Sequence, residues 1–131
     1  NCRTDVGPKS KVNVQRQKSA FPPNFVHSLD ATHMLITATM CSKKNILFAS
    51  VHDSYWTHAG SVEDMNILIR DAFVELHRQP ILDQLLQFWK AHYGGLNMIQ
   101  GARAKKVKLL PLPKRGIIDL EKVKNSPYFF D

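Results

Sequence analysis

Residues 46–58, ILFASVHDSYWTH, contain the pattern from which the architecture follows most directly. An apolar run over residues 46–51 is interrupted at His52-Asp53-Ser54 and resumes as an aromatic and β-branched run over residues 55–58. This order predicts a strand, a two-residue turn and a second strand. Both faces of the first strand are apolar, so helices should cover the hairpin on at least one side. The turn then presents Asp53 from a rigid scaffold.

Helical patterns flank this hairpin on both sides. Upstream, Asn24 follows two prolines and is a suitable N-cap for a helix over residues 25–42. Downstream, Ser61 and Asp64 have the form of a capping box, and apolar residues follow them at helical spacing. A further helix should begin at Pro80 and end at a glycine pair. The sequence therefore predicts three principal helices.

The two ends of the chain are basic and aperiodic. Residues 1–20 predict a basic loop, or a loop with a short edge strand at Val12 and Val14, and residues 96–108 predict a mobile surface loop. A stiff proline segment and one or two helical turns follow, and the aromatic residues 128–130 should dock rather than fray. We expect an α+β fold: an antiparallel β-hairpin packed against about three principal helices, with a docked C-terminal tail.

Composition favours a globular chain with an anionic partner. Of its 131 residues, 44% are hydrophobic and 22% are charged, which excludes collagen-like and wholly disordered chains. The 18 Lys and Arg outnumber the 11 Asp and Glu, so the net charge is +7. The basic residues crowd residues 3–18 and 103–124, and basic flanks on a neutral middle suit nucleic acid. Ordinary solubility charge explains a net charge of this size equally well, and Lys114-Arg115 is either a solvated pair or a phosphate contact.

Cysteine usage and hydropathy indicate a soluble protein of a reducing compartment. Cys2 and Cys41 have no metal-ligand or redox spacing, so both are expected to be free thiols, and Cys41 to be a small buried hydrophobe. No run approaches the roughly 20 apolar residues of a membrane helix, and no signal-peptide pattern is present. The chain begins at Asn1 rather than Met, which favours a processed product or an excised piece of a longer protein.

His52-Asp53-Ser54 is the first candidate site. A carboxylate at a tight turn can project into a cleft and bind a hard cation, and Mg²⁺ prefers one or two carboxylates with phosphate oxygens and water. Asp also suits turns for a structural reason, because it hydrogen-bonds its own backbone. The bulky Tyr55 and Trp56 that follow favour the metal interpretation, since large aromatic residues are costly in a mere surface turn.

A second candidate lies on the first predicted helix, where His27, Asp30 and His33 follow one another at intervals of three residues. These offsets spread the side chains over about 120° of the helix, so one metal ion could not easily collect all three. A hydrogen-bonded His27 and Asp30 that reach a substrate or the hairpin, and a satisfied core histidine, are equally supported. Nucleophilic catalysis is not supported, because no G-x-S-x-G elbow, Walker loop or G-x-G-x-x-G follows a predicted strand.

Two blocks, FPPNFVHSLDATH over residues 21–33 and SVHDSYWTHA over residues 50–59, resemble the C-terminal part of the single-subunit, phage-type RNA polymerases, in particular the mitochondrial branch. The resemblance covers nearly the whole chain, including LPLPKRG at residues 110–116 and SPYFF at residues 126–130. Related DNA polymerases also carry the His-Asp pair, but there the next residue is usually Glu, whereas here it is Ser54. Two long blocks at the family's spacing make the resemblance specific.

The resemblance implies a role for each matching position. Asp53 would be the second of the two palm aspartates that hold the catalytic Mg²⁺ ions for nucleotidyl transfer, and thus the catalytic and metal-binding residue here. His27 and His52 would lie beside the RNA 3′ end or its base pair with the template. The remaining expected substrate or nucleic-acid contacts come from the hairpin and from the C-terminal foot, which packs back toward the active site: Ser54, Tyr55, Phe130 and Asp131.

The resemblance also implies an incomplete site. Two-metal transfer needs ions about 3.5–4 Å apart, bridged by carboxylates from separate strands. The family's first palm aspartate, and the fingers lysine and tyrosine that handle the triphosphate, lie upstream of the matching region. We therefore expect residues 1–131 to be the C-terminal part of a catalytic domain that does not polymerise alone. Its parts would be a basic loop (1–20), palm helices with the hairpin (21–95), and a basic loop with the foot (96–131).

The implied cofactor is Mg²⁺, and the implied partners are a DNA template, nascent RNA, ribonucleoside triphosphates and, for the full-length enzyme, transcription initiation factors, with no membrane. The implied location is the mitochondrial matrix. Two other functions stay open on the residues alone. A small non-catalytic module that binds single-stranded nucleic acid would need no Mg²⁺. A Mg²⁺-dependent phosphodiesterase would combine Asp53 with His27 and Asp30.

Overall fold

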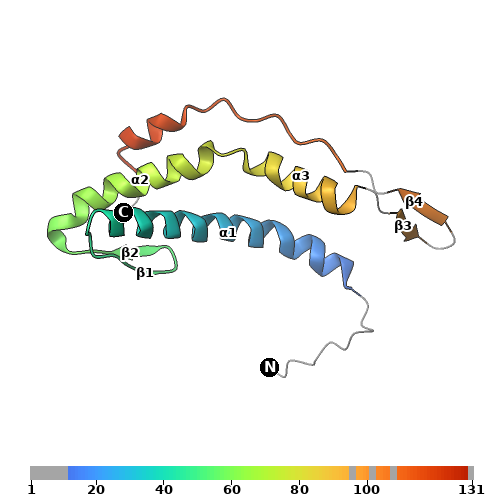
Figure 1. Ribbon diagram of the computed structural model, residues 1–131, viewed down its shortest axis with the longest axis horizontal. Helices are drawn as coiled ribbons and strands as arrows, with labels where there is room; N and C mark the ends of the chain where they lie inside the picture. Colours follow the sequence, from blue (N-terminus) through green and yellow to red (C-terminus); the bar gives the residue numbers. More distant parts are fainter. Residues whose placement is uncertain (1–11, 95–96, 101–102, 107–108, 130–131) are drawn as a thin grey trace, which may run out of the picture. The chain divides into compact units, whose positions relative to one another are not determined.

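The computed structural model describes residues 12–94, 97–100, 103–106 and 109–129. The chain divides into two compact units, residues 1–59 and 60–131. The described elements are three α-helices, two β-hairpins and two short 3₁₀ helices. Figure 1 labels the α-helices and the strands. This composition confirms the predicted α+β class with three main helices.

The first unit is built on one long helix, α1 (Val14–Lys43). The side chain of Asn13 caps it, because its Oδ1 accepts a hydrogen bond of 3.0 Å from the backbone N–H of Arg16. The predictions of a loop up to residue 20 and of an N-cap at Asn24 are therefore wrong, and α1 runs across both positions. Residues 1–11 of the expected loop lie outside the described part.

Two prolines inside α1 explain this error. Pro22 and Pro23 each lack the backbone N–H that an α-helix uses, so each removes one intrahelical hydrogen bond. Residues 12–24 are all exposed, however, so water can serve the carbonyl groups that the prolines leave unpaired. Two prolines are thus accommodated inside the exposed part of α1.

The buried stripe of α1 consists of His33, Thr37 and Cys41, which recur every four residues and therefore lie on one face. The Thr37 hydroxyl donates a hydrogen bond of 2.9 Å to the carbonyl of His33, so its polar atom is satisfied inside the helix. Cys41 is fully buried, as predicted, and burial raises the pKa of its thiol, an effect that Lys44 partly opposes.

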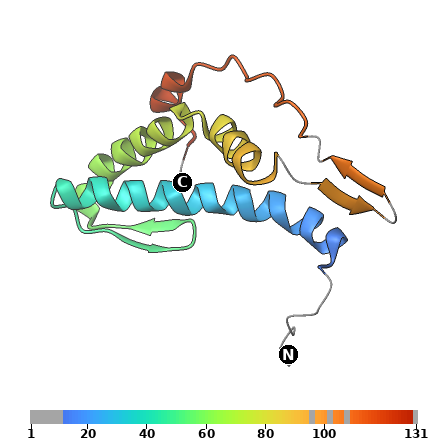
Figure 2. The same ribbon diagram turned by 45° about the vertical axis from the view of Figure 1, so that its right-hand side comes forward.

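The catalytic candidate lies on the hairpin of strands β1 (Ala49–Val51) and β2 (Ser54–Trp56), which pair antiparallel. The strands are shorter than predicted, and the predicted two-residue turn is confirmed. Figures 1 and 2 both show the hairpin running alongside α1. The face that carries Ser50 and Tyr55 is half-buried and the other is exposed, so the expected cover exists on one side.

The second unit is centred on α2 (Val62–Arg78), which the 3₁₀ helix η1 (Ala59–Ser61) precedes. Ser61 occupies the predicted N-cap position, but its side chain forms no capping hydrogen bond, so the capping box itself is not made. The core of this unit is the apolar stripe that α2 buries, and Val74 is buried on the opposite face of the helix. The stripe consists of Met65, Leu68, Ile69, Ala72 and Leu76.

The helix α3 (Ile81–Tyr93) follows Pro80 and ends at Gly94, as predicted. A second antiparallel hairpin then forms from β3 (Asn97–Gln100) and β4 (Arg103–Lys106), so the prediction of an irregular loop is wrong there. The hydrogen bonds between its strands are made by backbone groups. They can therefore form in a sequence without alternating apolar residues, and for that reason the pattern did not indicate the hairpin. The 3₁₀ helix η2 (Leu120–Asn125) confirms the short helix predicted near the end of the chain.

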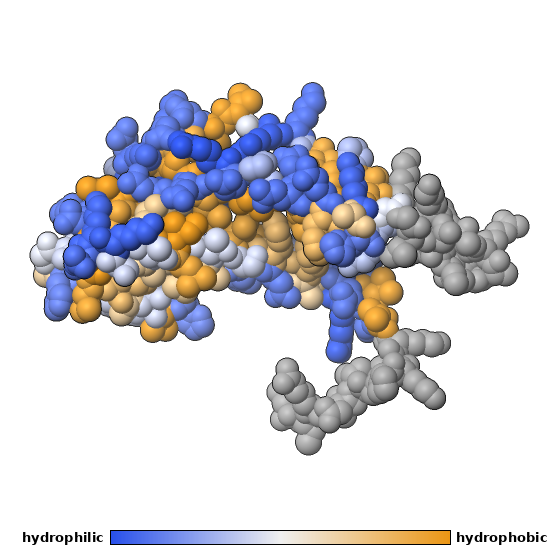
Figure 3. Space-filling model, in the orientation of Figure 1, coloured by the Kyte–Doolittle hydropathy of each residue, from blue (hydrophilic) through white to orange (hydrophobic). Residues whose placement is uncertain are grey.

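Large apolar side chains also lie on the surface of the described residues. Figure 3 shows hydrophobic residues between hydrophilic ones over the visible face. Four of the exposed apolar side chains lie along α1: Val14, Phe21, Val26 and Leu35. Among the helices that the structure describes, none combines the length and the apolar character needed to cross a bilayer.

Candidate functional site

The turn of the first hairpin has an unusual backbone. His52, its first central residue, has φ of 56°, and the only other non-glycine residue with positive φ in the described ranges is Asn45. Type II′ hairpin turns require positive φ at this position, where glycine is the usual residue. An L side chain there costs about 1–2 kcal/mol. The turn thus places an imidazole where glycine would be the stable choice.

Asp53 is the second central residue of the turn and its side chain is exposed. Within the part of the chain that the structure describes, its carboxylate has no hydrogen-bond donor and no cation as a partner. The structural explanation, an aspartate that hydrogen-bonds its own turn, is therefore not what the geometry shows. The carboxylate is available to a ligand.

Tyr55 fixes the hairpin from its covered face. Its ring lies edge-on to Phe48, with 5.2 Å between the ring centroids, and 6.4 Å from the ring of His33 on α1. Burial raises the pKa of the Tyr55 phenol, and the negative charges of Asp30 and Asp53 raise it further. The hydroxyl therefore keeps its proton and can donate a hydrogen bond. Ser54, directly before it, is exposed.

His27 and Asp30 form a pair on the exposed surface of α1. The distance from His27 Nδ1 to Asp30 Oδ2 is 3.7 Å, and the two side chains are 78% and 72% exposed. This distance is too long for the predicted hydrogen bond, although the two side chains are neighbours as expected. His33, in contrast, is buried, so the helix separates the three side chains as predicted. Among the described residues, no group of three or more His, Cys, Asp or Glu side chains is placed to hold a metal.

The C-terminal aromatic residues behave differently from one another. Phe129 packs edge-on against Phe73 of α2, with 5.1 Å between the ring centroids, so the predicted docking is confirmed for this residue. Tyr128 is 84% exposed, so the prediction is wrong there. Its hydroxyl tolerates water, which makes burial of the ring less necessary. Phe130 and Asp131, both expected site residues, lie outside the described residues.

Arg70 on α2 is the main functional candidate that the sequence did not indicate. Its Nη1 donates to the carbonyl oxygens of Val123, Lys124 and Ser126, at 3.5, 3.1 and 2.5 Å. Its guanidinium also lies 5.6 Å from the ring centroid of Phe129. These partners are more than 50 positions away along the chain, so no local spacing predicts them.

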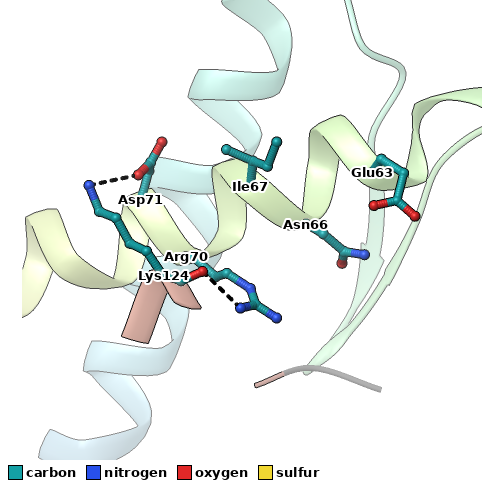
Figure 4. A pocket seen from close by; sticks show the side chains of 6 residues that line it. All are labelled: Glu63, Asn66, Ile67, Arg70, Asp71 and Lys124. Atoms are coloured by element: carbon teal, nitrogen blue, oxygen red, sulfur yellow. Dashed lines mark hydrogen bonds and ion pairs between the residues drawn. The ribbon is translucent and has the colours of Figure 1, made fainter. Parts of the chain in front are cut away.

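An open pocket of about 300 Å³ adjoins these contacts (Figure 4). Lys124 pairs there with Asp71 at 3.0 Å and, beside the pocket, with Glu121 at 3.1 Å. The hydrogen bonds that Lys124 donates to these two carboxylates raise its pKa, so it stays charged. The pocket is lined by residues of α2 and η2: Glu63, Asn66, Ile67, Arg70, Asp71 and Lys124.

Arg115 forms a structural contact with α2 that the sequence did not indicate. Its Nη2 donates to the carbonyl oxygens of His77 and Arg78 at the C-terminal end of α2, at 3.2 and 3.3 Å. Helix C-termini leave such carbonyls unpaired and attract cations. The residue is therefore a helix-capping contact rather than a merely solvated charge.

Comparison with known proteins identifies relatives over most of the chain. Residues 3–108 match the family described as DNA-dependent RNA polymerase. DNA-directed RNA polymerase 1A of Nicotiana tabacum is 49% identical over 121 residues, which cover 92% of this chain and 71% of that protein. The same share of this chain is 49% identical to DNA-directed RNA polymerase 1, mitochondrial, of Nicotiana sylvestris and 47% identical to DNA-directed RNA polymerase 2, chloroplastic/mitochondrial, of Arabidopsis thaliana. In each of these two proteins the match spans 11% of the length.

Proposed function

The chain belongs to the DNA-dependent RNA polymerase family, and we propose that it acts as the C-terminal part of a polymerase catalytic domain in which Asp53 binds a catalytic Mg²⁺. The observation that carries the proposal is the exposed Asp53 carboxylate, which has no partner among the described residues and sits on a strained two-residue turn. Residues 1–131 would form one segment of that domain.

The chemistry of the turn fits Mg²⁺. This ion takes one or two carboxylates, and phosphate oxygens and water complete its shell. Asp53 offers one carboxylate that no protein cation neutralises within the described residues. When bound, the metal would supply charge stabilisation at the reacting phosphates. A two-ion site needs a further carboxylate from a separate strand, which a longer catalytic domain would provide.

The exposed apolar side chains along α1 support a larger domain. Val14, Phe21, Val26 and Leu35 are each at least 44% exposed. Large apolar side chains that another part of a protein covers are removed from water, which stabilises the contact. We propose that other parts of the catalytic domain cover them.

The residues around Asp53 would contact the nucleic acid and the nucleotide. His52 and Ser54 flank the carboxylate on the exposed turn, and His27 is exposed on α1 of the same unit. We propose that the two histidines lie beside the RNA 3′ end and that the protonated Tyr55 hydroxyl is a hydrogen-bond donor to substrate. We also propose Phe130 and Asp131, which lie outside the described residues, as substrate or nucleic-acid contacts.

The substrates would be ribonucleoside triphosphates, with a DNA template and nascent RNA held partly by the net charge of +7. Transcription initiation factors would act on the full-length enzyme. Two of the three relatives are named mitochondrial or chloroplastic/mitochondrial, which supports an organellar location. The resemblance to the mitochondrial branch makes the mitochondrial matrix our proposal.

The test replaces the proposed metal ligand in the full-length polymerase that contains these residues. Asp53→Asn removes the charge while keeping the shape, and nucleotide addition should fall by on the order of a thousandfold. Binding to a primed RNA–DNA scaffold should change little, because the carboxylate does not grip nucleic acid. Asp30→Asn is the matched control, since Asp30 is also an exposed acid of the first unit, and it should keep nearly normal rates. Normal elongation by D53N would refute the proposal.

A further inference from the structure

The net charge of the chain is concentrated in one segment. Residues 84–118 contain seven Lys and Arg and no Asp or Glu, whereas the rest of the chain contains 11 residues of each sign. This segment therefore accounts for the whole net charge of +7. We propose that the C-terminal end of α3 and the β3–β4 hairpin, which lie in this segment, form a surface that binds single-stranded nucleic acid. The inference uses residues of the second unit alone and does not depend on a metal ion at Asp53.

Aromatic rings gather at the C-terminal end of α3, a helix that buries none of its residues. The ring centroids of Phe88 and His92 are 4.0 Å apart, and that of Tyr93 is 6.3 Å from His92. Phe88 and Tyr93 are 52% and 47% exposed, and His92 is exposed as well. Unpaired bases stack on such rings whatever their identity, because every base has a π-face. The end of α3 therefore offers aromatic surface to a single strand.

Positive charge accompanies these rings. Lys90 is exposed in the last turn of α3, and no described carboxylate pairs with it. The strand β4 adds a cation at three of its four positions: Arg103, Lys105 and Lys106. Lys and Arg bind phosphates without regard to base sequence, and each phosphate contact releases counterions. Rings for the bases thus occur together with cations for the phosphates.

The strand pairing places the last two cations of β4 near the end of α3. The strand β3 begins four residues after Tyr93, so the chain itself keeps Asn97 within about 14 Å of that residue. In the antiparallel ladder Asn97 pairs with Lys106, and Met98 pairs with Lys105. Paired residues have Cα atoms only about 5 Å apart. The aromatic end of α3 and the basic end of β4 therefore lie within reach of one bound strand.

The hairpin has little support from other parts of the described chain. β3 and β4 pair with each other, and neither packs extensively on another described element. A two-stranded hairpin on its own is only marginally stable in water. The like charges of β4 also repel one another, and a bound phosphate chain would offset that repulsion. Nucleic acid would therefore stabilise the hairpin as well as bind to it.

The combination of rings and cations favours a single strand over other polyanions. A duplex keeps its base faces inside the stack, and an anionic lipid surface has phosphates but no bases. The chain belongs to the DNA-dependent RNA polymerase family, whose reaction involves both an RNA strand and a DNA strand. The shared chemistry of the two is a phosphodiester chain with unpaired bases, and the test therefore includes both.

The test uses the full-length polymerase that contains these residues. The enzyme is first bound to an unlabelled primed RNA–DNA scaffold without single-stranded ends, so that its reaction site is occupied. A labelled single strand of about 12 nucleotides, of DNA in one arm and of RNA in the other, is then added. Fluorescence anisotropy at several salt concentrations gives the Kd and its salt dependence. Tight binding of at least one of the two strands is the expected result, and no binding of either would overturn the inference.

The charge variant replaces four cations of this surface by Gln: Lys90, Arg103, Lys105 and Lys106. It should bind the strand at least about tenfold more weakly, and the slope of log Kd against log salt should fall by up to about 3. The matched control replaces one Arg and three Lys of α1 by Gln: Arg16, Lys18, Lys43 and Lys44. All four are exposed, and this control should keep both quantities nearly unchanged. Equal losses in the two variants would overturn the inference.

The aromatic variant combines Phe88→Leu with Tyr93→Leu. Binding of the single strand should weaken by about tenfold or more, because the stacking surface is lost. Tyr128→Leu is the control, since that ring is 84% exposed in the same unit, and it should stay within about twofold. Phe88→Trp keeps a ring that stacks and should keep the affinity, which separates stacking from damage to α3. An unchanged Kd in the aromatic variant would overturn the role of the rings.

Three further results would contradict the proposal. A duplex that competes as well as a single strand would show that unpaired bases are not recognised. Loss of binding to phosphatidylglycerol vesicles in the charge variant, with normal binding of the single strand, would assign the cations to a lipid surface. A charge variant that self-associates but binds the strand normally would show that the lysines only protect the strand edge. The D53N enzyme should bind the added strand normally, so failure of this inference and failure of the proposed function are separate outcomes.

Discussion

The hairpin turn and the α2–η2 region differ in whether their charged side chains have partners in the protein. At the turn, Asp53 is exposed and no described residue neutralises it. In the α2–η2 region, Lys124 is bonded to Asp71 and Glu121, and Arg70 to backbone carbonyls. The first region keeps a charge free for a ligand, whereas the second uses its charges to hold the chain in place.

The two regions also differ in their backbones: the turn is strained, whereas the start of η2 is stabilised by a capping hydrogen bond. His52 occupies the positive-φ position of the turn, which costs energy that glycine would save. Asp119, in contrast, caps η2 by accepting a hydrogen bond of 3.1 Å from the backbone N–H of Glu121. Strain without an internal compensation is typical of functional sites. The comparison therefore favours the proposed metal-binding role for the turn and a supporting role for the α2–η2 region.

The largest expected effect concerns how strongly the rate of nucleotide addition depends on the exact position of a carboxylate in each region. Asp53→Glu keeps the charge but moves it by one methylene, and the rate of nucleotide addition should fall by about a hundredfold. Glu121→Asp makes the reverse change in an exposed ion pair and should alter the rate by less than about twofold. Both rates come from single-nucleotide extension by the full-length enzyme. Similar losses in the two variants would break the comparison.

The second effect concerns the core that supports α2. Ile69 is 1% exposed, and Ile69→Ala should lower the free energy of unfolding by about 2–5 kcal/mol, because it leaves a cavity. Ile67→Ala is the control, since that side chain is 56% exposed and should cost much less. Urea unfolding followed by circular dichroism measures both. Equal costs would mean that α2 does not bury the face described above.

A third, smaller effect separates stability from function at the turn. His52→Gly should raise the free energy of unfolding by up to about 1 kcal/mol, because glycine adopts positive φ without a steric cost. The same variant should slow nucleotide addition, since the imidazole is lost. Asn45→Gly, at the other positive φ, should stabilise the fold and leave the rate unchanged. A destabilised H52G variant would show that the side chain supports the turn instead.

The smallest effect is a pH dependence of the first unit. Burial, followed by the charges of Asp30 and Asp53, raises the pKa of Tyr55 above its ordinary value near 10. The folded chain thus keeps a proton that the unfolded chain has lost, so stability is fully present below about pH 10 and declines as the pH rises through the folded pKa. Spectroscopic titration of tyrosinate should show one late phenol that Tyr55→Phe removes. Identical curves for both proteins would contradict this.

Local signals in the sequence predicted much of the fold. Ser61, Pro80 and Gly94 mark helix ends through their own backbone preferences, and each lies where the pattern placed it. The two-residue turn follows from the short apolar run and its interruption. The prediction of where α1 starts was wrong because Pro22 was interpreted as a helix breaker. In the structure Pro22 lies inside the exposed part of the helix, where water can serve the carbonyl group that it leaves unpaired.

The candidate site could be predicted only in part. The position of Asp53 in a two-residue turn was predicted from the interrupted apolar run, and its exposure fits a ligand site. Its metal-binding role came from the family resemblance and stays a prediction. Arg70 was missed because its partners at Val123, Lys124 and Ser126 are far away along the chain, and periodicity reports only near neighbours. The exposure of Tyr128 beside the docked Phe129 likewise depends on tertiary packing that no local pattern encodes.

The central claim, a metal ion at Asp53, is tested most directly by replacing Mg²⁺ with Fe²⁺ in the full-length polymerase bound to primed template and nucleotide. Ascorbate and peroxide then produce hydroxyl radicals at the bound iron, which cut the nearby backbone, and mass spectrometry locates the cuts. The proposal predicts cuts at residues 52–54 that disappear in the D53N variant. Cuts that avoid the turn, or that persist unchanged in D53N, would contradict it.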